Sequence, residues 1–227
     1  MSIHVEIWSD VMCPFCYIGK RKFEAALAQF PERDRVRVVW RSFQLSPELK
    51  SEPGQNIHQY LSKHKGIPLE EAERLNDYVT EMAAEVGLTY RFDKAVVANS
   101  FHAHRFAHFA KQHGKQNEAE ERLFRAYFTE GENLDDYPTL IQLGAEIGLD
   151  TDALKAALEN GTFTDEVRED IYEAFQFGIR SVPFFVFDRK YAVAGAQDSQ
   201  VFLQTLEETF AEWKNENSGA AVEAGKA

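Results

Sequence analysis

Hydrophobic and polar residues follow a strand, helix, strand order near the amino end. Residues 3–8 form a short apolar run that predicts a buried strand. Phe23, Leu27 and Phe30 then recur at helical spacing, and a proline follows them. Valine and tryptophan alternate with arginine over residues 35–45, which predicts a second strand. Two strands joined through a helix indicate a right-handed βαβ unit.

Beyond a loop rich in proline and glycine, the pattern changes to successive helices. The predicted helices cover residues 57–64, 69–86, 98–113, 116–129, 138–147 and 150–159. Strand patterns return only at 182–188 and 191–194, which together predict a hairpin. A last helix is expected over 198–213.

This order of elements predicts an α/β fold whose sheet is completed late in the chain. Residues 1–56 and 164–214 would form the α/β domain, and residues 57–163 an all-helical insertion domain. Residues 215–227 are small and polar, and we expect a flexible tail there.

The overall charge narrows the range of partners. The 227 residues carry a formal net charge of -12, so nucleic acid and anionic membrane surfaces are not expected partners. The amino end enters the first predicted strand without a basic segment and apolar stretch, which favours a cytoplasmic location. Reducing conditions there would keep a cysteine pair as a dithiol except during turnover, so a structural disulfide is not expected.

The two cysteines of the chain lie three residues apart in Cys13-Pro14-Phe15-Cys16, between the first predicted strand and its helix. An intracellular Cys-x-x-Cys in this position is typical of a redox pair. Unpaired N–H groups and the helix dipole favour the thiolate of Cys13, and Cys16 falls on nearly the same helix face, where it can attack a mixed disulfide. Pro14 suits the first helical turn, and Phe15 is an apolar spacer.

Two other readings of the cysteine pair remain. The pair could be half of a zinc site, but there is no second Cys-x-x-Cys, so His102, His104 and His108 would have to complete it. A histidine pair at i,i+4 is more often a solvated or packed helix face than a metal site, and we expect no metal. The two cysteines could also be inert core residues, but packing alone explains poorly why a proline stands at the start of the helix.

Together with a second segment near the carboxyl end, the cysteine motif resembles the DsbA-like thioredoxin superfamily, and within it the signal-less members of the FrnE type. The resemblance covers nearly all of residues 3–213. The segments that carry it are Cys13-Pro14-Phe15-Cys16-Tyr17-Ile18-Gly19-Lys20, Asn99-Ser100-Phe101-His102-Ala103-His104-Arg105, Ser181-Val182-Pro183-Phe184-Phe185-Val186-Phe187 and Val193-Ala194-Gly195-Ala196-Gln197.

The resemblance implies a thioredoxin fold interrupted by a helical domain, with Cys13 as the attacking thiol and Cys16 as the resolving thiol. It also implies that Pro183 is a cis-proline beside them. A cis X-Pro bond would turn the Val182 backbone toward the dithiol, where a substrate peptide could pair with it as an added strand. Taken alone, a proline entering a strand is simply an edge or first-residue proline.

Several further residues are expected near the dithiol. Glu6 could be a buried acid below the thiols that accepts the proton of Cys16, or an exposed strand glutamate. Similarity to the family suggests that Asn99, His104 and Arg105 shape the substrate pocket. Residues Gly195, Gln197 and Asp198 could contact a ligand similar to glutathione.

The leading functional hypothesis is a thiol-disulfide oxidoreductase that reduces, forms or isomerises disulfides in proteins or small thiols. It would hold no tightly bound cofactor, use a redox-active disulfide with glutathione as a candidate co-substrate, and need a separate electron donor or acceptor. A glutathione-dependent isomerase or kappa-type glutathione transferase is one alternative, although such enzymes typically have serine at the first position. A redox-switched binding protein is the other alternative.

Overall fold

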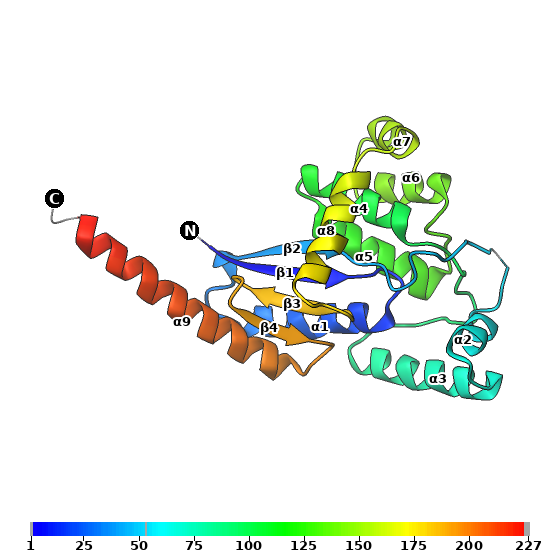
Figure 1. Cartoon of the computed structure of the whole chain (residues 1–227), viewed down its shortest axis with the longest axis horizontal. Helices are drawn as coiled ribbons and strands as arrows, with labels where there is room; N and C mark the ends of the chain where they lie inside the picture. Colours follow the sequence, from blue (N-terminus) through cyan, green and yellow to red (C-terminus); the bar gives the residue numbers. More distant parts are fainter. Residues whose placement is uncertain (1, 53, 225–227) are drawn as a thin grey trace.

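The computed structural model of the chain describes residues 2–52 and 54–224. Its one sheet has the strand order β2-β1-β3-β4 (Figure 1). Strands β1 and β2 are parallel, whereas β3 pairs antiparallel with both β1 and β4. The strands are β1 Ile3–Ser9, β2 Val36–Ser42, β3 Phe184–Phe187 and β4 Tyr191–Ala194.

The predicted βαβ unit and hairpin are present. Helix α1, Pro14–Gln29, joins the parallel strands β1 and β2, and a tight turn joins β3 to β4. Both β2 and β3 are shorter than the predicted strands over 35–45 and 182–188. A short 3-10 turn, Arg33–Arg35, occupies the start of the first of these ranges.

Six helices and a π-helical turn separate β2 from the last helix before β3. These are α2 Ile57–Lys65, α3 Leu69–Glu85, α4 Phe101–Gln112, α5 Gln116–Arg125, the π-helical turn η2 Ala126–Glu130, α6 Tyr137–Glu146 and α7 Thr151–Glu159. Each predicted helix in this block is present within a few residues. Just before helix α4, Asn99 Oδ1 accepts the backbone N–H of Phe101, the first residue of the helix.

Two elements near the carboxyl end differ from the prediction. The pattern over Thr164–Gln176 did not predict helix α8, which buries Val167, Asp170 and Ala174 against its neighbours. Helix α9, Ser199–Ala224, continues past the predicted end at residue 213, so the expected tail is helical up to Ala224. The segment after residue 213 contains no proline that would stop the helix. Residues 225–227 of that predicted tail lie outside the described residues.

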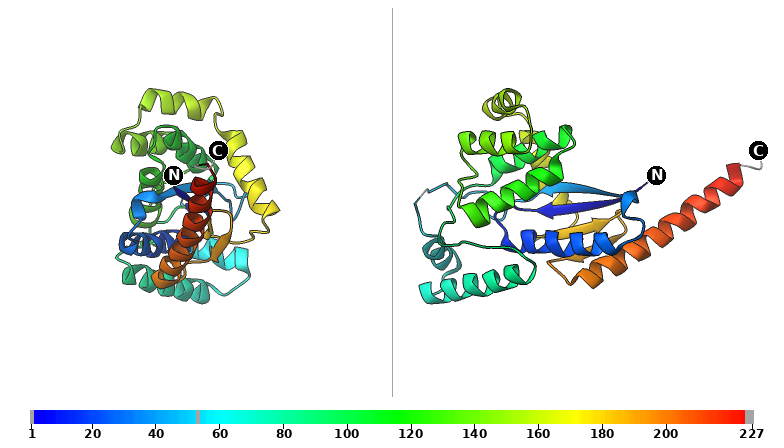
Figure 2. Two further views of the ribbon diagram at one scale, coloured as in Figure 1. Left: turned by 90° about the vertical axis from the view of Figure 1, so that its left-hand side faces the viewer. Right: turned by 180° about the vertical axis from the view of Figure 1, so that it is seen from behind.

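Helices cover the sheet on both faces. Helices α1 and α9 pack against each other, and α9 also contacts β1, β3 and β4 (Figure 2). Helix α8 lies against β2 and α4 on the other side. The pair α2 and α3 lies beyond the end of the sheet where α1 begins (Figure 1). Strand β1 is therefore enclosed, and every one of its residues except His4 is buried.

The main apolar core runs from the sheet into the helical block without a break. It joins Trp8 and Phe185 of the sheet to Phe106 of α4 and Phe124 of α5. A smaller cluster of Ile57, Ala95 and Val97 lies under α2. The predicted insertion domain, residues 57–163, therefore shares its core with the α/β part across α4 and α5. Among the described helices, none is long and apolar enough to cross a membrane.

Candidate active site

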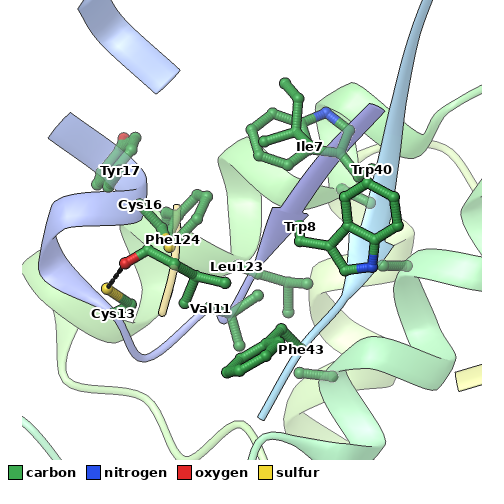
Figure 3. Packing of buried hydrophobic residues seen from close by; sticks show 14 of the residues in the cluster. Ile7, Trp8, Val11, Cys13, Cys16, Tyr17, Trp40, Phe43, Leu123 and Phe124 are labelled. Carbon is green, nitrogen blue, oxygen red and sulfur yellow. Dashed lines mark hydrogen bonds between the residues drawn. The ribbon is translucent and has the colours of Figure 1, made fainter. Parts of the chain in front are cut away.

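Cys13 is the residue that caps the amino end of α1, and Pro14 is the first helical residue. The Cys13 backbone N–H donates to Asp10 O at 2.9 Å, and Cys16 N–H donates to Cys13 O at 3.0 Å. Both cysteines are free thiols set in the apolar cluster at the mouth of the helix (Figure 3). The local fold therefore presents Cys13 where the unpaired N–H groups of the first turn gather.

The segment just before β3 contacts Cys13. The Val182–Pro183 peptide bond is cis. Cys13 Sγ donates to Val182 O at 3.5 Å (dashed line in Figure 3). Pro183 O accepts the backbone N–H of Gly195 at 2.8 Å, which ties this segment to the end of β4. Strands β3 and β4 and the start of helix α1 thus fix the position of Val182 relative to the Cys13 thiol.

Both cysteines are buried, and Cys16 is the more enclosed, with 1% of its surface exposed against 3% for Cys13. Burial raises the pKa of the Cys16 thiol well above its ordinary value, and the neighbouring Cys13 raises it further. The nearby Ser9 hydroxyl and Asp10 backbone act in the opposite direction and lower this pKa. These surroundings favour the protonated thiol of Cys16 over the thiolate.

Cys13 opens into a cavity of about 590 Å³, a size typical of small-molecule sites. The walls are mostly apolar and come from the β1–α1 loop, residues 45–49, α2, α3, residues 92–100, η2 and Val182. Pro14, Phe15 and Val182 line the cavity together with Cys13, so the structure brings these predicted site residues together. Cys16 is not among the lining residues.

Glu6 does not lie where either expectation placed it. Its side chain is buried, which excludes an exposed strand glutamate. The carboxylate accepts hydrogen bonds from Arg41 Nε at 3.0 Å and Arg189 Nε at 2.8 Å. Burial raises the pKa of Glu6, but these two arginines outweigh burial and lower it. In the described part of the chain no hydrogen bond joins Glu6 to either thiol.

The acid beside the dithiol is Asp10. Its carboxylate accepts the backbone N–H of Met12 at 3.2 Å and of Leu45 at 2.8 Å, so it holds the β1–α1 loop against the segment after β2. His104 Nε2 lies 3.7 Å from Asp10 Oδ1. Burial lowers the pKa of His104, but Asp10 and Glu120 outweigh burial and raise it. His104 therefore lies next to Asp10 and does not line the cavity.

Glu120 of α5 completes this buried polar cluster. Burial raises its pKa to about 7, although the charges of His104 and Lys20 partly offset the rise. Ser9 Oγ, His104 Nε2 and Glu120 Oε2 are buried and have no hydrogen-bond partner among the described residues. Such unpaired buried groups are uncommon in folded proteins.

The remaining predicted pocket residues have positioning contacts. Asn99 Nδ2 donates to Leu49 O at 2.8 Å and Pro47 O at 3.1 Å, which fixes one wall of the cavity without lining it. Arg105 is directed away from the dithiol and donates to carbonyl groups at the end of α7 and beyond it, including Ala157 O at 2.7 Å.

The residues after β4 make hydrogen bonds that stabilise the turn between β4 and α9. Gly195 has a positive φ of 80° and binds Pro183 O, as described above. Gln197 Nε2 donates to Ala194 O at 2.9 Å, and Asp198 Oδ1 accepts the N–H of Gln200 at the start of α9. Neither Gln197 nor Asp198 lines the cavity.

The three histidines of α4 face different partners. His102, His104 and His108 are paired with Asp135, Asp10 and Asp170 respectively. Within residues 2–52 and 54–224, no cluster of three or more His, Cys, Asp or Glu side chains has the arrangement of a metal site.

Sequence reasoning missed two parts of the site. Asp10 was not among the predicted site residues, although its position just after a buried strand and before the cysteines was an available signal. The cavity walls from α2 and α3 were not singled out because apolar residues at helical spacing indicate burial of one face, and not what that face encloses.

Comparison with known proteins gives one consistent result. Residues 4–207 match the protein family described as the DSBA-like thioredoxin domain. The Bacillus subtilis (strain 168) protein YwbO is 30% identical over 209 residues, which cover 91% of this chain and 96% of that protein.

Two solved structures show the same architecture. The crystal structure of a probable DsbA oxidoreductase from Streptomyces coelicolor is 39% identical, covers 92% of this chain and 91% of its own, and superposes with a TM-score of 0.86. The cytosolic disulfide reductase DsbM from Pseudomonas aeruginosa shares the fold at 17% identity and a TM-score of 0.62, over 95% of this chain and 98% of its own. The chain belongs to the DsbA-like thioredoxin family of thiol oxidoreductases.

Proposed function

We propose that the chain catalyses thiol-disulfide exchange in which Cys13 attacks and Cys16 resolves. The observation that carries this proposal is the different placement of the two sulfurs. Cys13 lines the cavity at the amino end of α1, whereas Cys16, one helical turn further on, does not line it.

The reaction follows from this placement. The Cys13 thiolate attacks one sulfur of a substrate disulfide, the S–S bond breaks, and the second sulfur leaves with the electron pair. Cys16 then loses its proton and attacks Cys13, which releases the first half of the substrate as a thiol. The substrate gains two electrons and the dithiol loses two. The reverse sequence donates a disulfide, so the direction depends on the reduction potential of the pair.

Val182 would position the substrate in this reaction. Its carbonyl lies 3.5 Å from Cys13 Sγ, and its backbone N–H donates no hydrogen bond within the described residues. A substrate backbone next to the reacting sulfur could accept that N–H as an added strand does. Pro183, Pro14 and Phe15 would act as positioning residues around the thiol.

The electrons must be supplied or removed by a separate molecule, and glutathione is the candidate that we propose. We also propose that the reaction takes place in the cytoplasm, which agrees with a chain whose only two cysteines form one redox motif.

Serine variants of the two cysteines test the proposal. Cys13→Ser should abolish insulin-disulfide reduction and glutathione-dependent exchange because the nucleophile is lost. Cys16→Ser should instead accumulate a mixed disulfide at Cys13, which mass spectrometry detects. Val201→Ser introduces the same side chain on α9, away from the cavity, and should behave as wild type. Unchanged exchange in Cys13→Ser would refute the proposal.

A further inference from the structure

The cavity beside Cys13 has walls suited to one class of substrate. Its apolar lining includes Leu61, Ile67, Leu75, Val79 and Phe92, which come from α2, α3 and the segments beside them. Leu75 and Tyr78 are also among the large apolar or aromatic side chains that stay exposed in this chain, as are Phe15 and Leu45 at the same cavity. Exposed apolar side chains gathered around a reactive thiol indicate a surface that is covered when substrate binds.

Charged side chains at the cavity are few, and the one next to the thiol is acidic. Lys65 and His64 lie together at the end of α2, and the His64 ring is stacked on Tyr60. Asp10 is the acidic residue of the lining, and its carboxylate lies in the loop that leads to Cys13. Glutathione carries two carboxylates, and Asp10 would repel a carboxylate bound close to the thiol.

Polar groups are present at a few separate points of the wall. Asn76, Ser100 and the hydroxyl groups of Tyr60 and Tyr127 belong to lining residues from different segments. A mostly apolar cavity with a few separated polar groups is the usual form of a small-molecule site. Because chain segments surround this cavity on several sides, a compact molecule fits it better than a long extended chain does.

We propose that the cavity binds the apolar body of a small-molecule disulfide, or of the matching thiol, and that this body holds the sulfur against Cys13. The inference rests on the proposed exchange chemistry and adds the substrate class. The oxidised substrate is reduced by the two-step exchange described above, and the Cys13–Cys16 dithiol becomes the disulfide. Glutathione then serves as the separate electron donor rather than as the preferred substrate.

The direct test uses mixed disulfides that share a pyridine-2-thiol leaving group and differ in the other half. The rate of each probe with the reduced protein is divided by the rate of the same probe with free mercaptoethanol. On this normalised scale, the 2-phenylethyl probe should react about tenfold or more faster than the 2-hydroxyethyl probe. The glutathione probe should show no such gain. Equal normalised rates for all probes, or a preference for the glutathione probe, would overturn the inference.

Variants of the cavity wall give a matched comparison. Leu75 and Tyr78 are 42% and 58% exposed, and Val201 and Tyr172, away from the cavity, are 42% and 65% exposed. The double variant L75S/Y78S should lower the normalised preference for the 2-phenylethyl probe by about threefold or more. The control V201S/Y172S should keep the wild-type preference. Equal preferences in the two double variants would contradict the assignment.

A binding measurement separates this inference from the exchange proposal. The unreactive thioether 2-phenylethyl methyl sulfide should bind the Cys13→Ser variant with a negative heat-capacity change, because binding buries apolar surface without any reaction. Loss of exchange chemistry in the wild type together with thioether binding would refute only the proposed function. Exchange through Cys13 without thioether binding would refute only the cavity assignment.

A peptide arm distinguishes the source of the apolar group. A short peptide with phenylalanine next to a cysteine, activated with the same leaving group, is compared with the 2-phenylethyl probe. A gain with the compact probe supports the small-molecule assignment, whether or not the peptide shows it too. A gain confined to the peptide would overturn it in favour of a polypeptide substrate.

Discussion

At the scale of single residues, the two cysteines differ in what surrounds each sulfur. Cys13 Sγ meets the Val182 carbonyl and the cavity, whereas Cys16 is enclosed near Ser9 and Asp10. Burial raises the pKa of Cys16, so in the proposed exchange its proton would have to be removed before it attacks Cys13. The protonation states of the buried titratable side chains in this region therefore affect the stability of the protein.

Glu120 gives a prediction about pH and stability. Burial raises its pKa to about 7 from an ordinary value of 4.5, so the folded protein holds this proton more tightly than the unfolded chain does. The stabilising contribution of the proton is complete below pH 4.5 and is lost as pH rises to about 7. Glu120→Gln keeps a neutral side chain and lacks this loss. Wild type should therefore lose about 3 kcal/mol relative to the variant between roughly pH 5 and pH 8.

Urea unfolding at a series of pH values measures this difference. His104 also has a raised pKa and contributes a loss in the same direction, and because Glu120 is one cause of that rise, the His104 contribution is smaller in the variant. Glu207→Gln on the exposed side of α9 is the control, and its curve should run parallel to that of wild type. Parallel curves for wild type and Glu120→Gln would show that Glu120 does not hold a proton in the folded state.

At the scale of elements, helix α1 is held on two sides. Glu121 of α5 accepts hydrogen bonds from Tyr17 at 2.6 Å and Lys20 at 2.7 Å, and also binds Arg21. On the other side Gly19 packs against the segment that carries the cis peptide bond. A Cβ atom at Gly19 would lie 3.0 Å from Pro183 Cγ. The distance between the dithiol and Val182 therefore depends on a close helix–strand approach.

Gly19→Ala tests this approach. The added methyl group should push the Pro183 segment away by a few tenths of an ångström and lower the exchange rate about three- to tenfold, since reaction depends on alignment. Stability should change by less than about 1 kcal/mol because alanine favours the helix by a similar amount. Stopped-flow exchange and urea unfolding separate the two effects.

Gly144→Ala is the matched control for Gly19→Ala. Its Cβ would press on Leu154 in the helical block, away from the cavity. This variant should lose stability while the folded fraction keeps the wild-type exchange rate. If Gly19→Ala also loses stability and keeps its exchange rate, the contact with Pro183 does not position the substrate segment.

The elements also show what the sequence could predict. The βαβ unit, the hairpin and the helices from α2 to α7 follow from periodicity and from helix-end residues. Helix α8 was missed because only three of its residues are buried, and one of these is Asp170, bound by Ser42 N–H and His108. From sequence alone, a charged residue is assigned to the surface, because the partners that would allow its burial are not known.

The same limit applies to the site. Cys13, Cys16, Pro14 and Phe15 could be located from one short motif, and Val182 with Pro183 from the family resemblance. Glu6 has its place because Arg41 and Arg189 bind its carboxylate, and both are distant in sequence. The cavity could not be predicted because its walls come from segments that only the tertiary fold brings together.

At the scale of the whole molecule, the helical block and the sheet act as one support for the dithiol. The main core joins them, and Asp10 ties the β1–α1 loop to the segment that follows β2. The pair α2 and α3 adds walls to the cavity at the end of the sheet where α1 begins (Figure 1). In the proposed function, the helical block would therefore determine substrate choice, and the first strand and helix would carry the exchange chemistry.

The equilibrium redox titration of the Cys13/Cys16 pair in glutathione buffers, with mass spectrometry to count thiols, tests the central claim most directly. We predict one reversible transition in which two thiols per chain become one intramolecular disulfide. The midpoint then decides the direction of catalysis, because a potential near or below the cytosolic poise favours reduction and a much more oxidising one favours disulfide donation. Absence of any reversible two-thiol transition would contradict the account.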